Sequence, residues 1–447
     1  MRSRRTLLLV LASSLAAAAA QAGERRPLDR ALRARLAAAA VTPLDPGPSP
    51  PGPKVRLGRM LFFDKVLAGN RDVACATCHH PSLMTGDALS LSVGTGGSGL
   101  GPARVPGPGR TFVPRNATEL FDRGAPQWRT MFWDFRVSGA PGRFRTPAGA
   151  QLPDGLDGVL AAQAMFPVTG RDEMRGVPGD PNNELAGLTD DDFRGIWSGL
   201  TAQLLAIPGY RRLFADAYPS VPTSGLGFQH AANAIAAFET AAFTAADTPW
   251  DRFLAGDGRA LPRAAKRGTM LFYGKAGCVR CHAGNLLTDQ RPHNLAVPQF
   301  GPGKPPSPPL DLGCGPVSGR PADRFAFRTP PLRNVAVTGP WMHDGAYTTL
   351  EGAVRHHLDP ARALLAYDRS QLAPALRPTV LDDPATLRAV LATLDPLAGP
   401  IELADGEIDD LLAFLIGLTS PSVDSLDAVI PEAVPSGLPV DRFPAWR

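Results

Sequence analysis

The sequence predicts a mainly α-helical fold built from two related domains with long ordered loops. Apolar residues recur at helical spacing in "LDGVLAAQAMF", "HAANAIAAFETAAFTA" and "EIDDLLAFLIGL". No segment alternates apolar and polar residues for long enough to form a large sheet. Two stretches, "VRLGRMLFFDKVLAGNRDVACATCH" and "AAKRGTMLFYGKAGCVRCH", share a glycine and an apolar run ahead of a cysteine pair. This repeat predicts one related helical domain around each cysteine pair.

The start of the chain has the pattern of a secretory signal peptide. Basic "MRSRR" is followed by an apolar run from Thr6 to Ala20, with a cleavage site near Ala22. A membrane span needs about 20 apolar residues, and this alanine-rich run is shorter. We therefore expect an exported, periplasmic protein with no membrane span.

Composition shifts divide the chain into five parts. They are a signal peptide (1–22), a Pro/Gly-rich linker (23–53), an N-terminal domain (54–247), a C-terminal domain (248–420) and a Pro-rich tail (421–447). The formal net charge of +4 includes three signal arginines, so the mature chain carries about +1. That charge is too small for a general nucleic-acid or membrane-binding surface.

Four of the five cysteines lie in two C-x-x-C-H motifs. The motifs are Cys75–Cys78–His79 and Cys278–Cys281–His282. Two thiols at this spacing reach the two vinyl groups of a haem, while the next side chain meets the iron. Disulfides, a zinc site or a redox dithiol would not require a histidine after both pairs. The motifs predict two covalently bound c-type haems, one in each cytochrome c-like domain, facing a shared interface. Cys314 is expected to be an unpaired loop thiol.

Several motifs together carry a family resemblance. The twin motifs, "RNAT", "FWDFR", "FRTPPLRNVAVTGPWMHDGAYTTLEGAVRHH" and "LADGEIDDLLAFLIGLT" resemble the bacterial di-haem cytochrome c peroxidases and their relative MauG, the di-haem enzyme of methylamine utilisation. The resemblance covers roughly residues 54–420. It implies a peroxidatic haem in the N-terminal domain and an electron-transfer haem in the C-terminal domain.

The resemblance also predicts how the first iron is coordinated. The peroxidases carry a removable histidine sixteen residues after the motif histidine, where this chain has Thr95. A hydroxyl is a poor haem ligand, and neither His80 nor Met84 can easily swing across the porphyrin plane. We expect a five-coordinate first haem that is open to peroxide, as in MauG. A remote histidine, His230 or His293, is the alternative ligand.

For the second haem, the family takes a ligand from the helix after the "HDG" motif, at the position of His357. Thr348 to Glu351 has the pattern of a capping box that starts this helix. One apolar stripe then contains Leu350, Ala353, Val354 and His357. His356 falls about 100° around the helix, on a more polar side. We expect His357 to be the ligand, with His356 and Met342 as alternatives.

Peroxide chemistry needs an acid–base group over the open iron. The family's glutamate corresponds to Glu173, ten residues past Gln163, with Pro167 between them. Burial would raise the pKa of such a carboxyl group. On spacing alone, Glu173 could instead pair with Arg171 or Arg175 on a surface loop.

Two further sites follow from the resemblance. Trp133 corresponds to the family's inter-haem tryptophan and could relay an electron, although a core aromatic is the other interpretation. Phe135 replaces the glycine of the family's W-D-G-R pattern. A calcium ion between the domains would bind the Asn116 side chain and the carbonyls of Thr338 and Pro340. Asn116 could equally be an ordinary turn residue.

These observations leave three functions open. We favour a MauG-like oxidase that reacts with H2O2 and draws electrons from a protein partner. A cytochrome c peroxidase that removes H2O2 with electrons from a small redox protein is second, and a non-catalytic di-haem electron carrier is third. The electron source, the reduction potentials and the oligomeric state are left open. The tryptophans eligible as an electron exit are Trp128, Trp197, Trp250 and Trp341.

Overall fold

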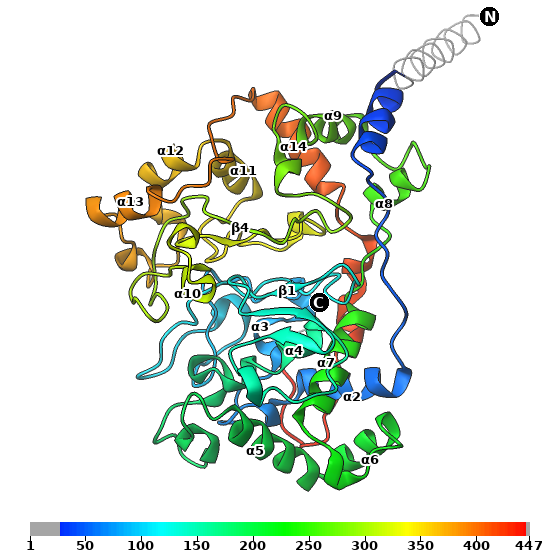
Figure 1. The fold of residues 1–447 in the computed structure, drawn as a ribbon, viewed down its shortest axis with the longest axis vertical. Helices are drawn as coiled ribbons and strands as arrows, with labels where there is room; N and C mark the ends of the chain where they lie inside the picture. The colour runs from blue at the N-terminus through cyan, green and yellow to red at the C-terminus, as the bar shows by residue number, and fades with distance from the viewer. Residues whose placement is uncertain (1–26, 444–447) are drawn as a thin grey trace, which may run out of the picture.

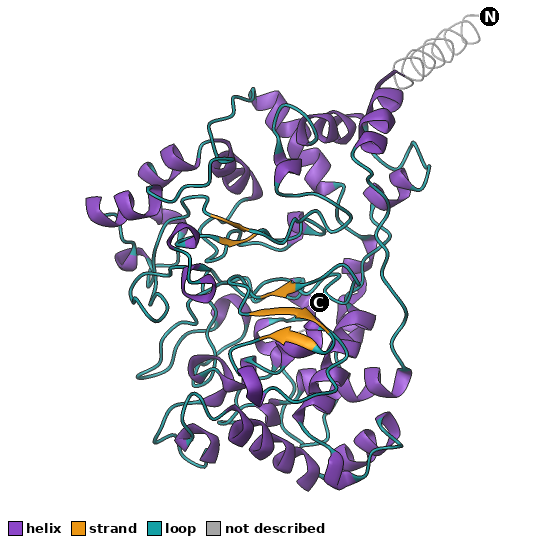
Figure 2. Cartoon of the chain, in the orientation of Figure 1, coloured by secondary structure: helices purple, strands orange, loops and turns teal. Residues whose placement is uncertain are grey.

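The computed structural model describes residues 27–443 and consists mainly of helices joined by long loops (Figures 1 and 2). The prediction of a mainly α fold is confirmed. The predicted signal peptide, residues 1–22, lies outside the described residues. Helices α2–α7 gather in one half of the molecule and α9–α14 in the other, with the small sheets between them (Figure 1).

The helices and strands have the following bounds. The first half contains α2 (Gly52–Phe63), α3 (Cys75–Cys78), α4 (Val159–Ala164), α5 (Phe193–Ala206), α6 (Pro208–Ala217) and α7 (Phe228–Ala242). The second half contains α8 (Pro249–Leu254), α9 (Arg263–Phe272), α10 (Gly315–Ser318), α11 (Leu350–Leu358), α12 (Pro360–Leu365), α13 (Pro384–Leu391) and α14 (Asp405–Ile416). Strands β1 (Thr130–Met131), β2 (Val137–Ala140) and β3 (Arg143–Arg145) form one antiparallel sheet, and β4 (Pro292–His293) pairs with β5 (Phe327–Arg328).

The repeat found in the sequence corresponds to one helix crossing in each half. A Cβ atom on Gly58 of α2 would lie 1.8 Å from the carbonyl oxygen of Ala234 in α7. A Cβ atom on Gly268 of α9 would lie 1.8 Å from the carbonyl oxygen of Asp410 in α14. Only glycine permits backbones to approach so closely. The shared glycine therefore sets the crossing of the helix that precedes each C-x-x-C-H motif.

Both described ends of the chain cross to the other half. Residues 27–38 form a helix within the predicted linker, and Leu32 and Leu36 pack in the core of the second half. The C-terminal tail leaves α14 and runs to the first half as the 3-10 helix η14 (Pro421–Val429) and a loop (Figure 1). Val423 and Leu426 join the core of the first half. The proposed domain boundaries stay a prediction. The described parts of the predicted linker and tail pack against the cores of the two halves.

Within residues 27–443, no single helix has both the length and the apolar composition to cross a bilayer. Helices α14 and η14 meet these criteria only as a pair, and they are bent by 43° relative to each other.

Replacing Gly58 with Ala should lower the free energy of unfolding by about 1–3 kcal/mol, because the methyl group would push α2 away from α7. Gly406→Ala is the matched control, since nothing lies within 4 Å of a Cβ atom there. It should leave stability unchanged or raise it by up to about 1 kcal/mol. Denaturant unfolding of the haem-loaded variants measures both, and equal values would contradict the close crossing.

Candidate functional site

A cavity of about 540 Å³ lies beside the first C-x-x-C-H motif. Its lining includes Cys75, Cys78, His79, Trp133, Gln163, Pro167 and Glu173. These side chains come from α3, the loop after β1, α4, and two short helical turns, η5 (Pro167–Thr169) and η6 (Arg171–Arg175). The structure thus brings all the residues predicted for the first haem and its acid–base chemistry to one cavity.

The hydrogen bonding of His79 suits an iron ligand. Its Nδ1 donates to the backbone carbonyl of Thr85 over 3.1 Å. This bond fixes the ring and leaves Nε2 for a metal, which is how ligating histidines are commonly held. Cys75 and Cys78 are free thiols rather than a disulfide, and burial raises the pKa of Cys75 to about 12. The donor set therefore fits covalent attachment of a haem.

Thr95 does not line this cavity. Its hydroxyl donates to Asp72 Oδ1 over 2.8 Å, and its backbone N–H donates to the carbonyl of Glu173 over 3.0 Å. Among the described residues, His79 is the one histidine that lines the cavity. The methionines at its wall, Met131 and Met174, pack in the core of the first half.

The alternative ligands for the first iron lie elsewhere. His80 has both ring nitrogens in hydrogen bonds, to a backbone carbonyl and a backbone N–H. The ring of His230 packs edge-on against Tyr218, with the centroids 4.8 Å apart. Met84 packs on the core of the first half, and His293 lines a different cavity. None of these four alternative ligands lines the first cavity.

Glu173 is held over the cavity by close backbone packing. A Cβ atom on Gly94 would lie 2.4 Å from the carbonyl oxygen of Glu173, so the Thr95 loop fits directly against η6. Burial raises the pKa of the Glu173 carboxyl group, and the nearby cations Arg136 and Lys304 oppose the shift. A carboxylate whose pKa is raised is a better proton acceptor, and it can return the proton to a leaving oxygen.

The surface pairing considered for Glu173 does not form. Arg171 donates from Nε to Asp190 over 2.6 Å, and Arg175 pairs with the same carboxylate. Both arginines therefore pair with Asp190, and no ion pair joins either of them to Glu173, which lines the cavity.

The charged residues of the first cavity that sequence reasoning missed include Glu239, Lys304 and Arg328. Burial raises the pKa of Glu239 to about 8 and lowers that of Lys304 to about 8. They come from α7, an irregular loop and β5 respectively, and the sequence patterns around Glu239 and Arg328 do not show that these side chains reach the cavity.

A second cavity, of about 200 Å³, lies beside the other motif. Its lining includes Cys278, Cys281, His282, Met342, His357 and Trp133. His282 donates from Nδ1 to the carbonyl of Leu287 over 3.0 Å, and His357 donates from Nδ1 to that of Ala353 over 2.8 Å. Both rings therefore keep Nε2 for a metal.

The spacing of these two rings fits one iron between them. The ring centroids of His282 and His357 are 6.3 Å apart. Two metal–nitrogen distances of about 2.0 Å and two ring radii of about 1.1 Å give about 6.2 Å.

Two predictions about helix α11, the exposure of His356 and the capping residue, are wrong. His356 is buried, not on a polar side: its Nε2 donates to the carbonyl of Leu295 over 2.6 Å, and its Nδ1 lies 2.7 Å from the Tyr347 hydroxyl. With both nitrogens occupied, it does not line the cavity. The helix is capped by Thr349 rather than Thr348, because the Thr349 hydroxyl accepts from the Gly352 N–H.

Trp133 and Arg328 line both cavities. The Trp133 indole N–H donates to the carbonyl of Asn116 over 3.1 Å, and the backbone N–H of Arg328 donates to the carbonyl of Trp133 over 2.8 Å. The indole is thus fixed between the two predicted haem sites. Cys314 is a free, buried thiol close by, with Sγ 3.7 Å from the Trp133 carbonyl oxygen.

Two of the three predicted calcium-binding residues, Asn116 and Thr338, use their side chains in other hydrogen bonds. The Asn116 amide donates to the carbonyl of Leu89 over 2.8 Å. The Thr338 hydroxyl donates to the carbonyl of Val335 over 3.5 Å, and Pro340 follows a cis peptide bond. The calcium site stays a prediction.

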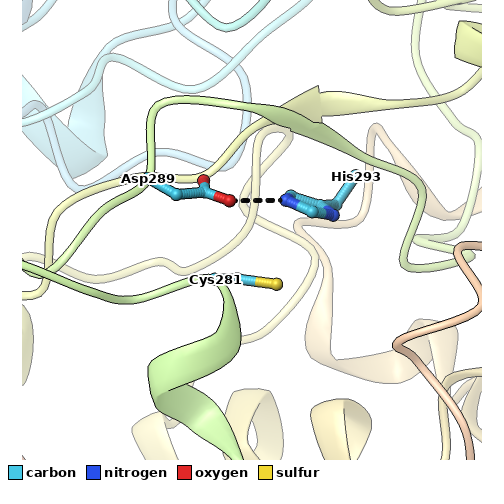
Figure 3. A group of neighbouring side chains, drawn as sticks. All are labelled: Cys281, Asp289 and His293. Atoms are coloured by element: carbon cyan, nitrogen blue, oxygen red, sulfur yellow. Dashed lines mark hydrogen bonds and ion pairs between the residues drawn. The ribbon is translucent and has the colours of Figure 1, made fainter. Parts of the chain in front are cut away.

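Figure 3 shows a cluster at the second cavity that sequence reasoning did not identify. Ligand atoms of Cys281, Asp289 and His293 all lie within 4.8 Å of one another. His293 bonds Asp289 through Nε2 over 3.0 Å and Asp395 through Nδ1 over 2.6 Å. The hydrogen bond to Asp289 is the main cause that raises the pKa of His293 to about 11. A haem bound through the Cys281 sulfur would leave this cluster as a partly buried imidazolium between two carboxylates rather than a separate metal site.

Comparison with known proteins supports the prediction of two c-type haems. The family model described as di-haem cytochrome c peroxidase matches residues 52–259. The chain is 33% identical to the methylamine utilization protein MauG of Methylorubrum extorquens, over 68% of each chain. It is 31% identical to the cytochrome c551 peroxidase of Pseudomonas aeruginosa, over 67% of this chain and 69% of that protein. Among solved structures, a MauG-like protein associated with microbial copper homeostasis is 27% identical and aligns with a TM-score of 0.59, covering 88% of this chain and 96% of its own.

Replacing His357 with Ala should remove the low-spin ferric EPR signal of the second haem, because one of its two imidazoles is lost. His356→Gln is the matched control, since both nitrogens of His356 are already hydrogen-bonded. That variant should keep the low-spin signal. A low-spin signal that survives in His357→Ala, or vanishes in His356→Gln alone, would assign the ligand differently.

Proposed function

The chain belongs to the di-haem cytochrome c peroxidase family, whose members are haem-dependent oxidoreductases with two c-type haems, and we propose that it is a periplasmic oxidase of the MauG type. It reacts with H2O2 at the N-terminal haem and withdraws electrons from a protein partner through the C-terminal haem. One observation carries the proposal. Among the described residues, His79 is the one histidine that lines the first cavity, and the Thr95 hydroxyl donates a hydrogen bond to Asp72 instead. Peroxide then has an open coordination position without prior reduction.

The chain's own residues have distinct roles in this proposal. Cys75, Cys78 and His79 hold one haem, and Cys278, Cys281, His282 and His357 hold the other. The haems supply the iron at which peroxide is cleaved and the store for the oxidising equivalents. Everything else, including proton transfer and the exclusion of water, falls to the side chains around them.

Glu173 is the proton shuttle in this proposal. Its carboxylate accepts the proton from one oxygen of H2O2 and returns it to the leaving oxygen. Gln163 lines the same wall and helps to orient the peroxide, and Pro167 starts the turn η5 that leads to η6. Lys304 and Arg136 keep a positive charge near the carboxyl group, which limits how far burial raises its pKa.

Trp133 is the relay between the two haems. It lines both cavities, and hydrogen bonds at its indole N–H and its backbone carbonyl hold it in place. A fixed aromatic ring between two redox centres shortens each electron step.

The second candidate is a cytochrome c peroxidase that takes electrons from a small periplasmic redox protein. The 31% identity to the cytochrome c551 peroxidase, close to the 33% identity to MauG, favours it. His357 argues for the first candidate, because a methionine ligand raises the potential of an electron-accepting haem and two imidazoles do not.

EPR spectroscopy of the fully ferric protein, before and after one equivalent of H2O2, tests the proposed function. We expect one high-spin and one low-spin signal at the start, and both should fade together on addition of peroxide. Two low-spin signals that ignore peroxide until one haem is reduced would instead identify a reductively activated peroxidase.

Replacing Glu173 with Gln should slow the reaction of the ferric protein with H2O2 by about 100-fold or more, because an amide cannot accept the proton. In the unmodified protein the rate should rise with pH through the raised pKa of Glu173, since the carboxylate is the active form. The variant should lose this rise. Stopped-flow absorbance measures the rates.

Glu184→Gln provides the control for this experiment. It makes the same chemical change at an exposed glutamate of the adjacent 3-10 turn η7 (Glu184–Gly187). Its rate and pH profile should match those of the unmodified protein. A normal rate in Glu173→Gln would remove Glu173 from the mechanism.

A further inference from the structure

The last described residues of the C-terminal tail contact the attachment motif of the predicted first haem. Asp441 accepts a hydrogen bond from the Thr77 hydroxyl over 2.5 Å, and its other carboxylate oxygen pairs with Lys65 over 2.6 Å. Thr77 lies between Cys75 and Cys78 and is fully buried. The tail therefore reaches into the four-residue helix α3 that carries both cysteines.

The Thr77 hydroxyl connects the tail to the start of that helix. It accepts a hydrogen bond from the Ala74 N–H over 2.9 Å while donating to Asp441. A hydroxyl that donates to a carboxylate forms a stronger bond than a neutral pair, and consecutive bonds reinforce one another. Breaking the bond to Asp441 would weaken the cap of α3 as well.

The residue after His79 is held by the same segment. His80 lies with Nε2 3.3 Å from the Asp441 carbonyl oxygen, and its Nδ1 accepts from the Ser82 N–H over 3.2 Å. The Phe443 ring meets the His80 ring edge-on, with the centroids 4.8 Å apart. The tail therefore contacts Thr77, two residues before His79, and His80, directly after it.

The tail is also anchored along its length. The Ser436 hydroxyl donates to Asp64 Oδ1 over 2.6 Å, at the end of α2. Ser82 lies three residues after His79, and its hydroxyl donates a hydrogen bond to Asp427 over 2.5 Å. These bonds fix the backbone before it reaches Asp441.

We propose that residues 436–443 form a clamp that sets the position of His79, and that Asp441 is its positioning residue for the first haem. A helix of four residues is far too short to be stable alone, so its place depends on what surrounds it. The clamp rests on the proposed function, because it acts on the iron at which peroxide is to react. No residue of the clamp lines the cavity, so it acts through α3.

Asp441→Ala should broaden or split the high-spin ferric EPR signal of the first haem and leave the low-spin signal of the second unchanged. The rate of reaction with H2O2 should fall roughly tenfold, because a small displacement of the reacting atom is costly. Asp424→Ala, at an exposed position of η14 in the same tail, is the control and should match the unmodified protein. An unchanged high-spin signal in Asp441→Ala would overturn the clamp.

A double-mutant cycle identifies the contact responsible. Thr77→Val removes the hydroxyl and keeps the shape, and the effect of the double variant on the high-spin signal should be smaller than the sum of the two single effects, because both variants remove the Thr77–Asp441 hydrogen bond. Fully additive effects would contradict the direct contact. If Asp441→Ala fails to fold, Asp441→Asn keeps an acceptor for Thr77 and gives the same readout in a milder form.

The clamp and the proposed function fail in different ways. The function fails if the unmodified protein has no high-spin haem. In that case the clamp is tested on the low-spin EPR signal of the first haem. This signal should still shift in Asp441→Ala and should stay unchanged in Asp424→Ala.

Discussion

Three histidines, His79, His282 and His357, each donate the Nδ1 hydrogen to a backbone carbonyl, and both predicted haem sites depend on this bond. It selects the tautomer and points Nε2 into a cavity. For the two motif histidines the acceptors are Thr85 and Leu287, both with positive φ. A side chain in this backbone region costs of order 1–3 kcal/mol and persists only where its surroundings hold it. The strained turn after each motif is thus the part of the repeat that aims the iron ligand.

The two halves are held together by buried charges close to Trp133. Arg115 pairs with Asp311 of the second half over 2.7 Å and with Asp134, the neighbour of Trp133, over 2.6 Å. Buried ions are costly unless they are paired, so this network tolerates few alternative arrangements. The position of the indole between the cavities therefore follows from a network that spans both halves. The orientation of Trp133 does not depend on its own packing alone.

Sequence reasoning located what is encoded locally and missed what arrives from a distance. The motif residues and the spacing from Gln163 to Glu173 are short-range patterns, and the structure gathers them at one cavity. His356 was placed on a polar side because its own helix shows only periodicity, whereas Tyr347 and Leu295 bury it. Lys304, Glu239 and the tail contacts of Asp441 leave no local signal. Each depends on a contact between segments far apart in the chain.

The two cavities differ in a way that separates their tasks. In the first, one face of the predicted haem meets His79 and the other meets a carboxyl group with a raised pKa. In the second, the ring centroids of His282 and His357 lie 6.3 Å apart, so a haem held by both histidines would leave no coordination position for peroxide. Such a site would only gain or lose electrons, and the partly buried imidazolium of His293 between two carboxylates would add a net negative charge beside it. A negative charge next to a metal favours its more oxidised state, because Coulomb attraction in a low-dielectric interior is strong. This asymmetry suits the proposed storage of oxidising equivalents, and the electrostatics of the second cavity, more than those of the first, are the reason for proposing the MauG type of chemistry.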